Sequence, residues 1–271
     1  MSIGTNIKSM REERNLTQEK VAEALGISFQ AVSSWERDEY KPDTDNLIRL
    51  SELLGVSVSA IAEEKHKPFK TRETIYNWEH MKTYVKTTAV NFKLRDTLKA
   101  LDYAVEAHKG QNRKRSTTPY IYHPLNLACH ALSMSIIEDE IVAACLLHDV
   151  IEDCHRSLED LPVGDETREL VRLLTCEKTT DENRTEILEA YYAGITANPK
   201  AALIKCIDRC NNLTTMSWGL SRERIYRMIK ETEAYYPALF KALKSTPEYN
   251  NAAWLLRYHI ESMLDIYKRL L

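Results

Sequence analysis

The chain has 271 residues, enough for about two domains, with a net charge of −3, seven Gly and eight Pro. This charge excludes an overall basic signal for nucleic acid or an anionic membrane, and no apolar run approaches the ~20 residues of a membrane span. Few Gly and Pro combined with amphipathic spacing predict an all-α protein. With no signal peptide we expect it in the cytoplasm, where its six Cys would be reduced.

Residues 1–66 predict a separate module of five short helices, from Ile3 to about Glu64. Thr17 is placed to cap a helix that stops at Gly26, and the next helix runs from about Ser28 to Arg37. The module resembles the helix-turn-helix domains of the phage-repressor type. The resemblance is carried by three words and a proline in register: Leu16-Thr17-Gln18, Leu25-Gly26-Ile27-Ser28, Val32-Ser33-Ser34-Trp35-Glu36 and Pro42.

This resemblance implies that the helix from about Ser28 to Arg37 enters the major groove of double-stranded DNA. The candidate DNA contacts are polar residues on or beside it: Gln18, Ser28, Gln30, Ser33, Ser34 and Arg37. Residues 1–66 hold eight Lys and Arg against twelve Asp and Glu, a net −4, although phosphate contacts supply much of DNA affinity. A dimerising or protein-interaction role therefore stays open beside DNA binding, and we expect a homodimer.

The rest of the chain predicts a linker followed by a larger helical domain. Residues 67–92 combine linker composition with a bridging helix that begins near Thr74, and residues 93–271 form the second domain. Near the end, residues 223–243 and 251–271 have helical apolar spacing. Their aromatic stripes are typical of a core or of a dimer seam.

Within the second domain, His148-Asp149 is followed one helical turn later by Glu152-Asp153. In a single helix these four polar groups share one face. Three carboxylates and an imidazole repel one another and are costly to desolvate unless a cation joins them. The pattern predicts a metal site, and the alternative is a solvated acidic turn after a buried helix.

Two other segments offer further ligands. His123 directly precedes a Pro and is expected at a helix start, whereas Asp208 stands in a mostly apolar run. The predicted ligands are two His and two Asp: His123, His148, Asp149 and Asp208. This nitrogen and oxygen set suits Mn²⁺, Fe²⁺ or Zn²⁺ better than Ca²⁺, and we expect Mn²⁺. Cys206 and Cys210 flank Asp208. We interpret them as buried thiols and keep a role as metal ligands as the alternative.

The order of these residues resembles the HD superfamily of metal-dependent phosphohydrolases. The surrounding words are most similar to the hydrolase domain of Rel/SpoT alarmone enzymes and the small alarmone hydrolases. They are Ala107–Lys114, Pro119–Pro124, His148–Asp153 and Ile207–Leu213, within a match from about Leu98 to Pro237. The resemblance implies hydrolysis of the 3′-pyrophosphate of (p)ppGpp to GDP or GTP and pyrophosphate. No Gly-rich phosphate loop is present, so we expect the nucleotide to be degraded and not made.

The resemblance also implies roles for individual residues. The metal would activate water and polarise a phosphoryl oxygen, while Glu152 and Asp153 would orient the water and move protons. The predicted substrate-binding residues are an Arg-Lys pair ahead of the first ligand and two residues on the helical face of Asp208: Arg113, Lys114, Asn212 and Thr215.

One loop departs from the family pattern. Residues 115–118, Arg-Ser-Thr-Thr, are one residue longer than usual and contain no Gly. Because this loop would border the nucleotide, another phosphorylated nucleotide such as ppApp or NADPH is an alternative substrate. A nucleotide-sensing transcription regulator is the other alternative.

Overall fold

A computed structural model of the protein describes residues 2–62, 77–113, 117–180, 182–215 and 221–270. The chain divides into two compact units, residues 1–71 and 72–271. Among the described residues every regular element is a helix, so the predicted all-α fold is confirmed.

The first unit packs five helices around a small apolar core, as the sequence predicted. They are α1 (Ile3–Glu13), α2 (Gln18–Leu25), α3 (Phe29–Glu36), α4 (Thr44–Leu54) and α5 (Val58–Ala62). The Thr17 side chain accepts a hydrogen bond from the backbone N of Lys20, and Gly26 ends α2 with a left-handed φ of 65°. Both predicted helix signals are confirmed.

A buried ion pair ties α1 to α3 in this unit. Arg11 Nε and Nη2 donate to the two carboxylate oxygens of Glu36 at 2.6 and 3.0 Å, and the Glu36 side chain is only 3% exposed. Gln18 Nε2 donates to the same carboxylate at 2.7 Å. The pair is bidentate, and both carboxylate oxygens of Glu36 accept hydrogen bonds. Removing either partner therefore leaves the other one as an unpaired charge in the interior.

We therefore expect Arg11→Met to destabilise the first unit by about 2–3 kcal/mol, between the values for exposed and fully buried pairs. Hydrogen exchange of peptides from α1 to α3 in the full chain measures the effect. Arg14→Met is the matched control, because Arg14 lies on the surface with a 3.9 Å pair to Glu13. Equal protection in the two variants would contradict the role given to this pair.

The second unit contains the longer helices. They are α6 (Trp78–Phe92), α7 (Arg95–Ala107), α8 (Tyr122–Ser133), α9 (Asp139–Leu147), α10 (Val150–Cys154), α11 (Asp165–Leu174), α12 (Arg184–Ala197), α13 (Pro199–Thr215), α14 (Arg222–Lys244), the 3₁₀ turn η2 (Pro247–Tyr249) and α15 (Asn250–Leu270). The two predicted C-terminal helices correspond to α14 and α15. The bridging helix appears as α6 within this unit, and its predicted start near Thr74 lies outside the described residues. No described helix is both long enough and apolar enough to span a membrane.

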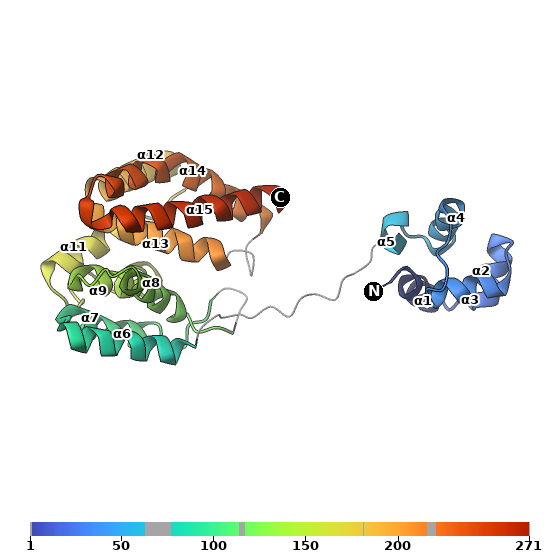
Figure 1. Ribbon diagram of the computed structural model, residues 1–271, viewed down its shortest axis with the longest axis horizontal. Helices are drawn as coiled ribbons and strands as arrows, with labels where there is room; N and C mark the ends of the chain where they lie inside the picture. The colour runs from blue at the N-terminus through green and yellow to red at the C-terminus, as the bar shows by residue number, and fades with distance from the viewer. Residues whose placement is uncertain (1, 63–76, 114–116, 181, 216–220, 271) are drawn as a thin grey trace. The chain divides into compact units, whose positions relative to one another are not determined.

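Helix α13 is the central element of this unit. It runs between the pair α8 and α9 on one side and the helices α14 and α15 on the other (Figure 1). Leu203, Ile204, Ile207 and Leu213 of α13 are fully buried. Because α13 is surrounded, each of its polar side chains must find a partner inside the unit, and this requirement positions the site described next.

Candidate metal centre and substrate cavity

The predicted metal ligands come from the N-terminal turn of α8, the α9–α10 junction and the middle of α13. Helix α8 begins at Tyr122, so His123 stands at a helix start as predicted. The prediction of one continuous helix through His148 and Asp153 was wrong. Helix α9 ends at Leu147, two residues form a turn, and α10 starts at Val150. The turn directs the imidazole of His148 and the carboxylate of Asp149 into one site.

The side chains of all four predicted ligands converge. The Nε2 atoms of His123 and His148 lie 3.2 Å apart. Asp149 approaches His148 Nε2 at 3.1 Å and His123 Nε2 at 3.5 Å. Asp208 Oδ1 lies 3.2 Å from His123 Nε2 and 3.9 Å from His148 Nε2. Ligand atoms of His123, His148 and Asp149 all fall within 4.8 Å of one another, a spacing that a single ion can bridge.

The hydrogen bonds of the two imidazoles show that this arrangement fits a cation. His148 Nδ1 donates to the backbone O of Cys145 at 2.9 Å, and His123 Nδ1 lies 2.6 Å from Asn211 Oδ1. Since both partners are acceptors, each Nδ1 carries the ring proton and each Nε2 of a neutral ring presents a lone pair. Two buried lone pairs and two carboxylates that face one another need a positive charge between them. The donor set therefore suits a divalent metal with mixed nitrogen and oxygen ligands.

The pKa shifts at the site have the same cause. Burial lowers the pKa of His148, but the charges of Asp149 and Asp208 outweigh it and raise this pKa to about 9. Burial opposes ionisation of Asp149, yet His148 and His123 hold its pKa well below the ordinary value. Both pKa shifts arise because the clustered carboxylates favour a positive charge beside them. Without a metal, a proton on His148 supplies that charge.

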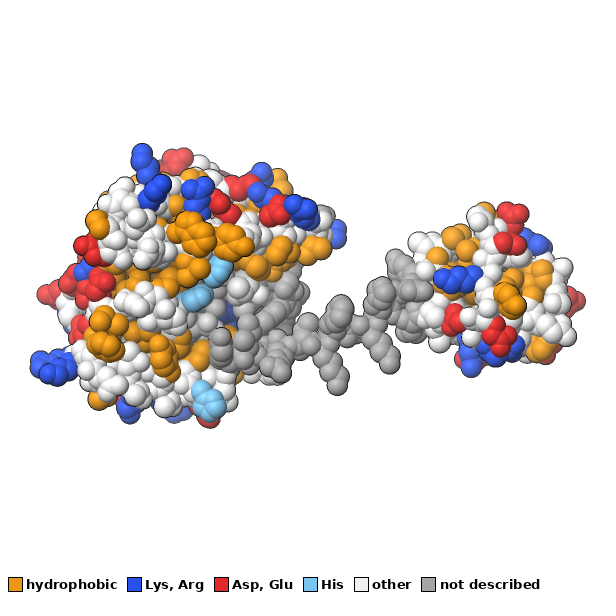
Figure 2. All heavy atoms as spheres, viewed as in Figure 1, with side chains coloured by type: hydrophobic (Ala, Val, Ile, Leu, Met, Phe, Trp, Pro, Cys, Tyr) orange, Lys and Arg blue, Asp and Glu red, His pale blue; other side chains and the backbone are white. Residues whose placement is uncertain are grey.

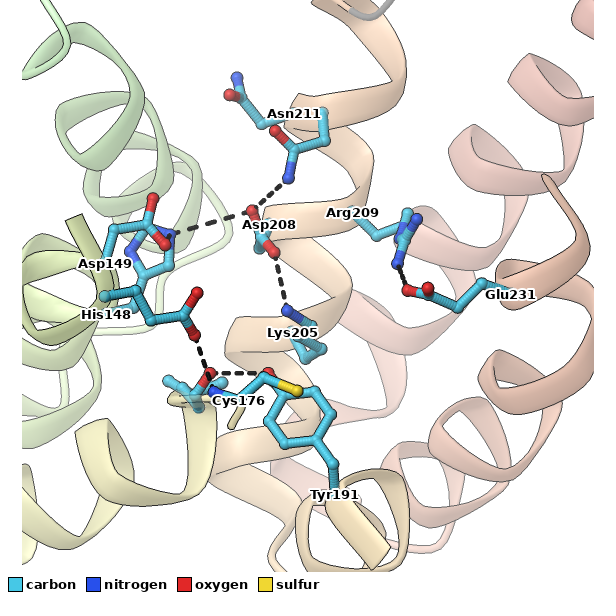
Figure 3. Close-up of polar contacts among 12 residues, drawn as sticks. His148, Asp149, Cys176, Tyr191, Lys205, Asp208, Arg209, Asn211 and Glu231 are labelled. Atoms are coloured by element: carbon cyan, nitrogen blue, oxygen red, sulfur yellow. Dashed lines mark hydrogen bonds and ion pairs between the residues drawn. The ribbon is translucent and has the colours of Figure 1, made fainter. Parts of the chain in front are cut away.

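Lys205 and Tyr120 complete the site, and sequence reasoning missed both. Lys205 Nζ lies 3.2 Å from Asp208 Oδ2, and the two residues are three apart on α13. Figure 3 shows Asp208 pointing from α13 toward His148, with Lys205 reaching the same carboxylate from below. Tyr120 donates its hydroxyl to Asp149 Oδ2 at 2.8 Å. The Pro-Tyr-Ile-Tyr-His word and the lone Lys in an apolar run were the available signals.

The predicted acidic pair stands beside the ligands. Glu152 Oε1 accepts a hydrogen bond from the backbone N of Cys176 at 2.7 Å, which turns this carboxylate toward the segment after α11. Partial desolvation raises the pKa of Glu152, the Cys176 hydrogen bond opposes the rise, and the charge of Asp149 adds to it. The backbone N of Asp153 donates to the backbone O of Asp149 at 2.9 Å, so Asp153 follows Asp149 by one turn.

The predicted substrate residues lie around the C-terminal half of α13. Asn212 Nδ2 donates to Asp208 Oδ1 at 2.6 Å, and Arg113 Nη2 donates to Thr215 Oγ1 at 3.0 Å. Lys114 lies outside the described residues. Of these residues, Asn212 is therefore in direct contact with a predicted metal ligand, and Arg113 is held against the end of the same helix.

A basic cavity of about 370 Å³ opens beside Asp208. Five cationic side chains from α12, α13 and α14 line it: Arg184, Lys205, Arg209, Arg224 and Arg227. Two carboxylates, those of Asp208 and Glu231, also belong to the lining. Sequence analysis assigned no role to Arg224 or Arg227. A cavity with this excess of positive charge, next to a candidate metal site, suits a ligand that carries several phosphates.

The six predicted DNA contacts differ in how free their side chains are. Gln30 and Arg37 are exposed on or directly after α3, but Arg37 also donates to Glu39 at 2.8 Å. The hydroxyls of Ser28 and Ser34 bond to the backbone of Ala31, Ser33 bonds to Arg37, and Gln18 bonds to Glu36. Gln30 is thus the member of this set that the described contacts leave most available.

The bond from His123 to Asn211 yields a prediction. Asn211→Ala removes the acceptor that fixes the His123 tautomer, and we expect metal affinity to fall by roughly 10- to 100-fold. Titration calorimetry with Mn²⁺ on the full chain measures the loss. Thr214→Ala is the control, because the Thr214 hydroxyl donates to the backbone O of Asn211 at 2.7 Å and so does not hold the His123 ring. An unchanged affinity in Asn211→Ala would show that the tautomer is set in another way.

Comparison with known proteins identifies the same two parts. A helix-turn-helix family model matches residues 7–61, and an HD domain family model matches residues 100–243. The human guanosine-3′,5′-bis(diphosphate) 3′-pyrophosphohydrolase MESH1 is 34% identical over 162 residues, which cover 54% of this chain and 90% of the relative. The enzyme of the same activity name from Aquifex aeolicus is 32% identical over 146 residues, 52% of this chain and 20% of the relative.

The chain thus spans nearly all of the short relative and a fifth of the long one. A solved structure, described as a metazoan ortholog of SpoT that hydrolyses ppGpp, aligns with a TM-score of 0.50 and 25% identity. The alignment covers 63% of this chain and 94% of that one.

Proposed function

Because the chain belongs to the HD-domain family, we propose that it hydrolyses the 3′-pyrophosphate of (p)ppGpp or a close analogue, with Mn²⁺ as its metal. The oxygen of water forms a bond to the phosphorus next to the ribose 3′ oxygen. The bond between that phosphorus and the 3′ oxygen breaks, and a proton from water ends on the 3′ hydroxyl. The products are pyrophosphate and GDP, or GTP from pppGpp.

The observation that carries this proposal is the convergence of two imidazole lone pairs and two carboxylates at the edge of a basic cavity. His123, His148, Asp149 and Asp208 would hold the metal, which when bound supplies a Lewis acid that activates water and polarises a phosphoryl oxygen. The cationic side chains of the neighbouring cavity would bind the phosphates and neutralise their charge.

The acidic pair supplies proton transfer in this proposal. Glu152 and Asp153 stand after the two ligands of the α9–α10 turn, and a pKa raised by burial makes the Glu152 carboxylate a stronger proton acceptor than an exposed Glu. Arg113 and Lys114 would contact the nucleotide, with Asn212 and Thr215 on its ribose and base side. Asn212 also positions Asp208 through their 2.6 Å hydrogen bond.

The helix-turn-helix module would bind this hydrolase to DNA. In this proposal residues 1–66 bind double-stranded DNA as part of a homodimer, and residues 93–271 form the hydrolase domain. Residues 67–92 are the linker and bridging helix between these two parts. The exposed side chain of Gln30 on α3 supports base contact, whereas the net charge of −4 predicts few phosphate contacts and hence a shallow salt dependence. All six Cys are free thiols, which supports a reducing cytoplasmic location.

The direct test is pyrophosphate release from ppGpp by the purified full chain with Mn²⁺, with ppApp and NADPH assayed in parallel. We expect release from ppGpp that stops when the metal is chelated. Preferential release from ppApp, or phosphate release from NADPH, would transfer the proposal to that nucleotide. No product from any of the three by metal-loaded protein would contradict the hydrolase function and favour a nucleotide-sensing regulator.

A further inference from the structure

A second cavity, also about 370 Å³, lies between α8, α13 and α15. Its wall consists of Tyr122, Asn126 and His130 from α8, Cys210, Asn211, Thr214 and Thr215 from α13, and His259, Ser262 and Met263 from α15. At about 3.6 residues per turn, the α13 residues of this cavity point to a different side of the helix from those that line the basic cavity. We call it the neutral cavity.

The chemistry of the neutral cavity differs sharply from that of the basic one. None of its described lining residues is Asp, Glu, Lys or Arg. Its polar groups are side-chain amides, imidazoles, hydroxyls and a thiol, which offer both donors and acceptors, and Tyr122 and Met263 add apolar surface. Histidine side chains lie among hydrophobic ones on the face of this unit drawn in Figure 2. Such a lining disfavours phosphates and metal cations and suits an uncharged polar ring.

One wall of the neutral cavity has an unmet hydrogen-bonding need. His130 Nδ1 is buried and has no hydrogen-bond partner among the described residues. Burial, and then the nearby His259, lower the pKa of His130, so its ring is neutral near pH 7. A buried polar atom without a partner costs free energy, and this one belongs to a residue of the cavity wall.

The opposite wall is joined to the metal centre. Asn211 lines the neutral cavity and is only 4% exposed, while its Oδ1 holds His123 Nδ1 at 2.6 Å. Any molecule that repositions the Asn211 amide therefore also repositions a metal-ligand imidazole. Supporting hydrogen bonds of this kind tune metal affinity.

We propose that the neutral cavity is a second ligand site, which binds an uncharged nitrogen heterocycle of nucleobase size and is coupled through Asn211 to the metal centre. Its volume lies at the small end of ligand pockets and accommodates a bicyclic purine ring, and the absence of Lys and Arg from its described lining disfavours a nucleotide with its phosphates. The edge of such a ring carries alternating donors and acceptors, which match the amides and imidazoles of the wall. Thr215 lines this cavity and is also proposed to contact the substrate nucleotide, so competition with ppGpp is needed to separate the two sites. The proposal does not rest on the hydrolase reaction, because binding at the cavity is measured by itself.

The first test is calorimetric titration of the full-length protein with hypoxanthine and with adenine. We expect at least one base to bind the wild type, and Ser262→Phe, which fills the cavity from α15, to weaken that binding at least tenfold. Asp265→Phe is the matched control, because Asp265 lies on the same helix but is exposed and outside the cavity. No binding to the wild type, or equal loss in both variants, would overturn the site.

The second test addresses the coupling. Binding of the base is measured with and without Mn²⁺, and binding of Mn²⁺ with and without the base. Linkage requires the two affinities to change by the same factor, and we expect a factor of about five or more. Base binding that is independent of Mn²⁺ would overturn the coupling through Asn211. A base that binds equally well to Ser262→Phe but competes with ppGpp would place it in the substrate cavity instead, and would also overturn the proposal.

Discussion

Replacing Asp149 by Asn is expected to abolish metal retention and to lower turnover by on the order of a thousandfold or more, beyond the roughly 10- to 100-fold of supporting residues. Asp149 lies against both imidazoles and carries the negative charge that a cation at this site requires. The amide keeps the shape of the side chain and can still accept the hydrogen bond from Tyr120, so the fold should persist. Metal content after gel filtration and pyrophosphate release from ppGpp are the two measurements.

A second variant separates holding the metal from moving the proton. Glu152→Gln should retain the metal, because Glu152 bonds to the backbone of Cys176 and lies outside the ligand cluster, yet lose about 10²- to 10⁴-fold in turnover. Asp102→Asn, an exposed carboxylate on α7, is the control and should change neither measurement. Metal loss in Glu152→Gln, or full activity in Asp149→Asn, would contradict the division of roles between these carboxylates.

Much of the fold, and the residues of the candidate metal centre, could be predicted from sequence because both depend on short-range patterns. Amphipathic spacing locates α14 and α15 within about a residue, and the Thr17 cap and Gly26 stop bound α2. The His-Asp pair, the His before Pro124 and the isolated Asp208 each carry a local signal. The structure brings them together because α8 and α9 both pack against one buried helix, α13.

The rest depends on side chains that meet from distant parts of the chain. Arg224 and Arg227 reach the cavity beside Asp208 because α14 packs on α13. Lys205 was hidden in an apolar run, where its charge is tolerated because Asp208 pairs with it. The turn at His148 was missed because helical periodicity continues on both sides of it, in α9 and in α10. No Gly or Pro in the sequence marks the break between the two helices.

Arg209 is the clearest case of such a distant contact, and Arg209→Met should destabilise the second unit by about 3–5 kcal/mol. Its guanidinium donates to Glu231 at 2.6 Å and to the hydroxyls of Tyr236 and Tyr192 at 2.9 and 3.2 Å. Arg209 is 6% exposed and points from α13 toward Glu231, away from Asp208 (Figure 3). Its removal leaves the Glu231 carboxylate with the neutral Tyr192 hydroxyl and the more exposed Arg184 as its described partners. Urea unfolding followed by far-UV circular dichroism measures the loss.

Arg172→Met is the matched control, since its pair with Glu169 is exposed on both sides and should contribute at most about 1 kcal/mol.

The pair of Arg209 and Glu231 also predicts how stability depends on acid pH. Burial raises the pKa of Glu231, but Arg209 outweighs burial and holds this pKa below 4.5, the value expected for the unfolded chain. The stabilisation is therefore complete above about pH 4.5 and is lost as the pH falls through the lower folded pKa. Arg209→Met should flatten this acid dependence, whereas Arg172→Met should preserve it, because Arg209 pairs with Glu231 and Arg172 pairs with the exposed Glu169.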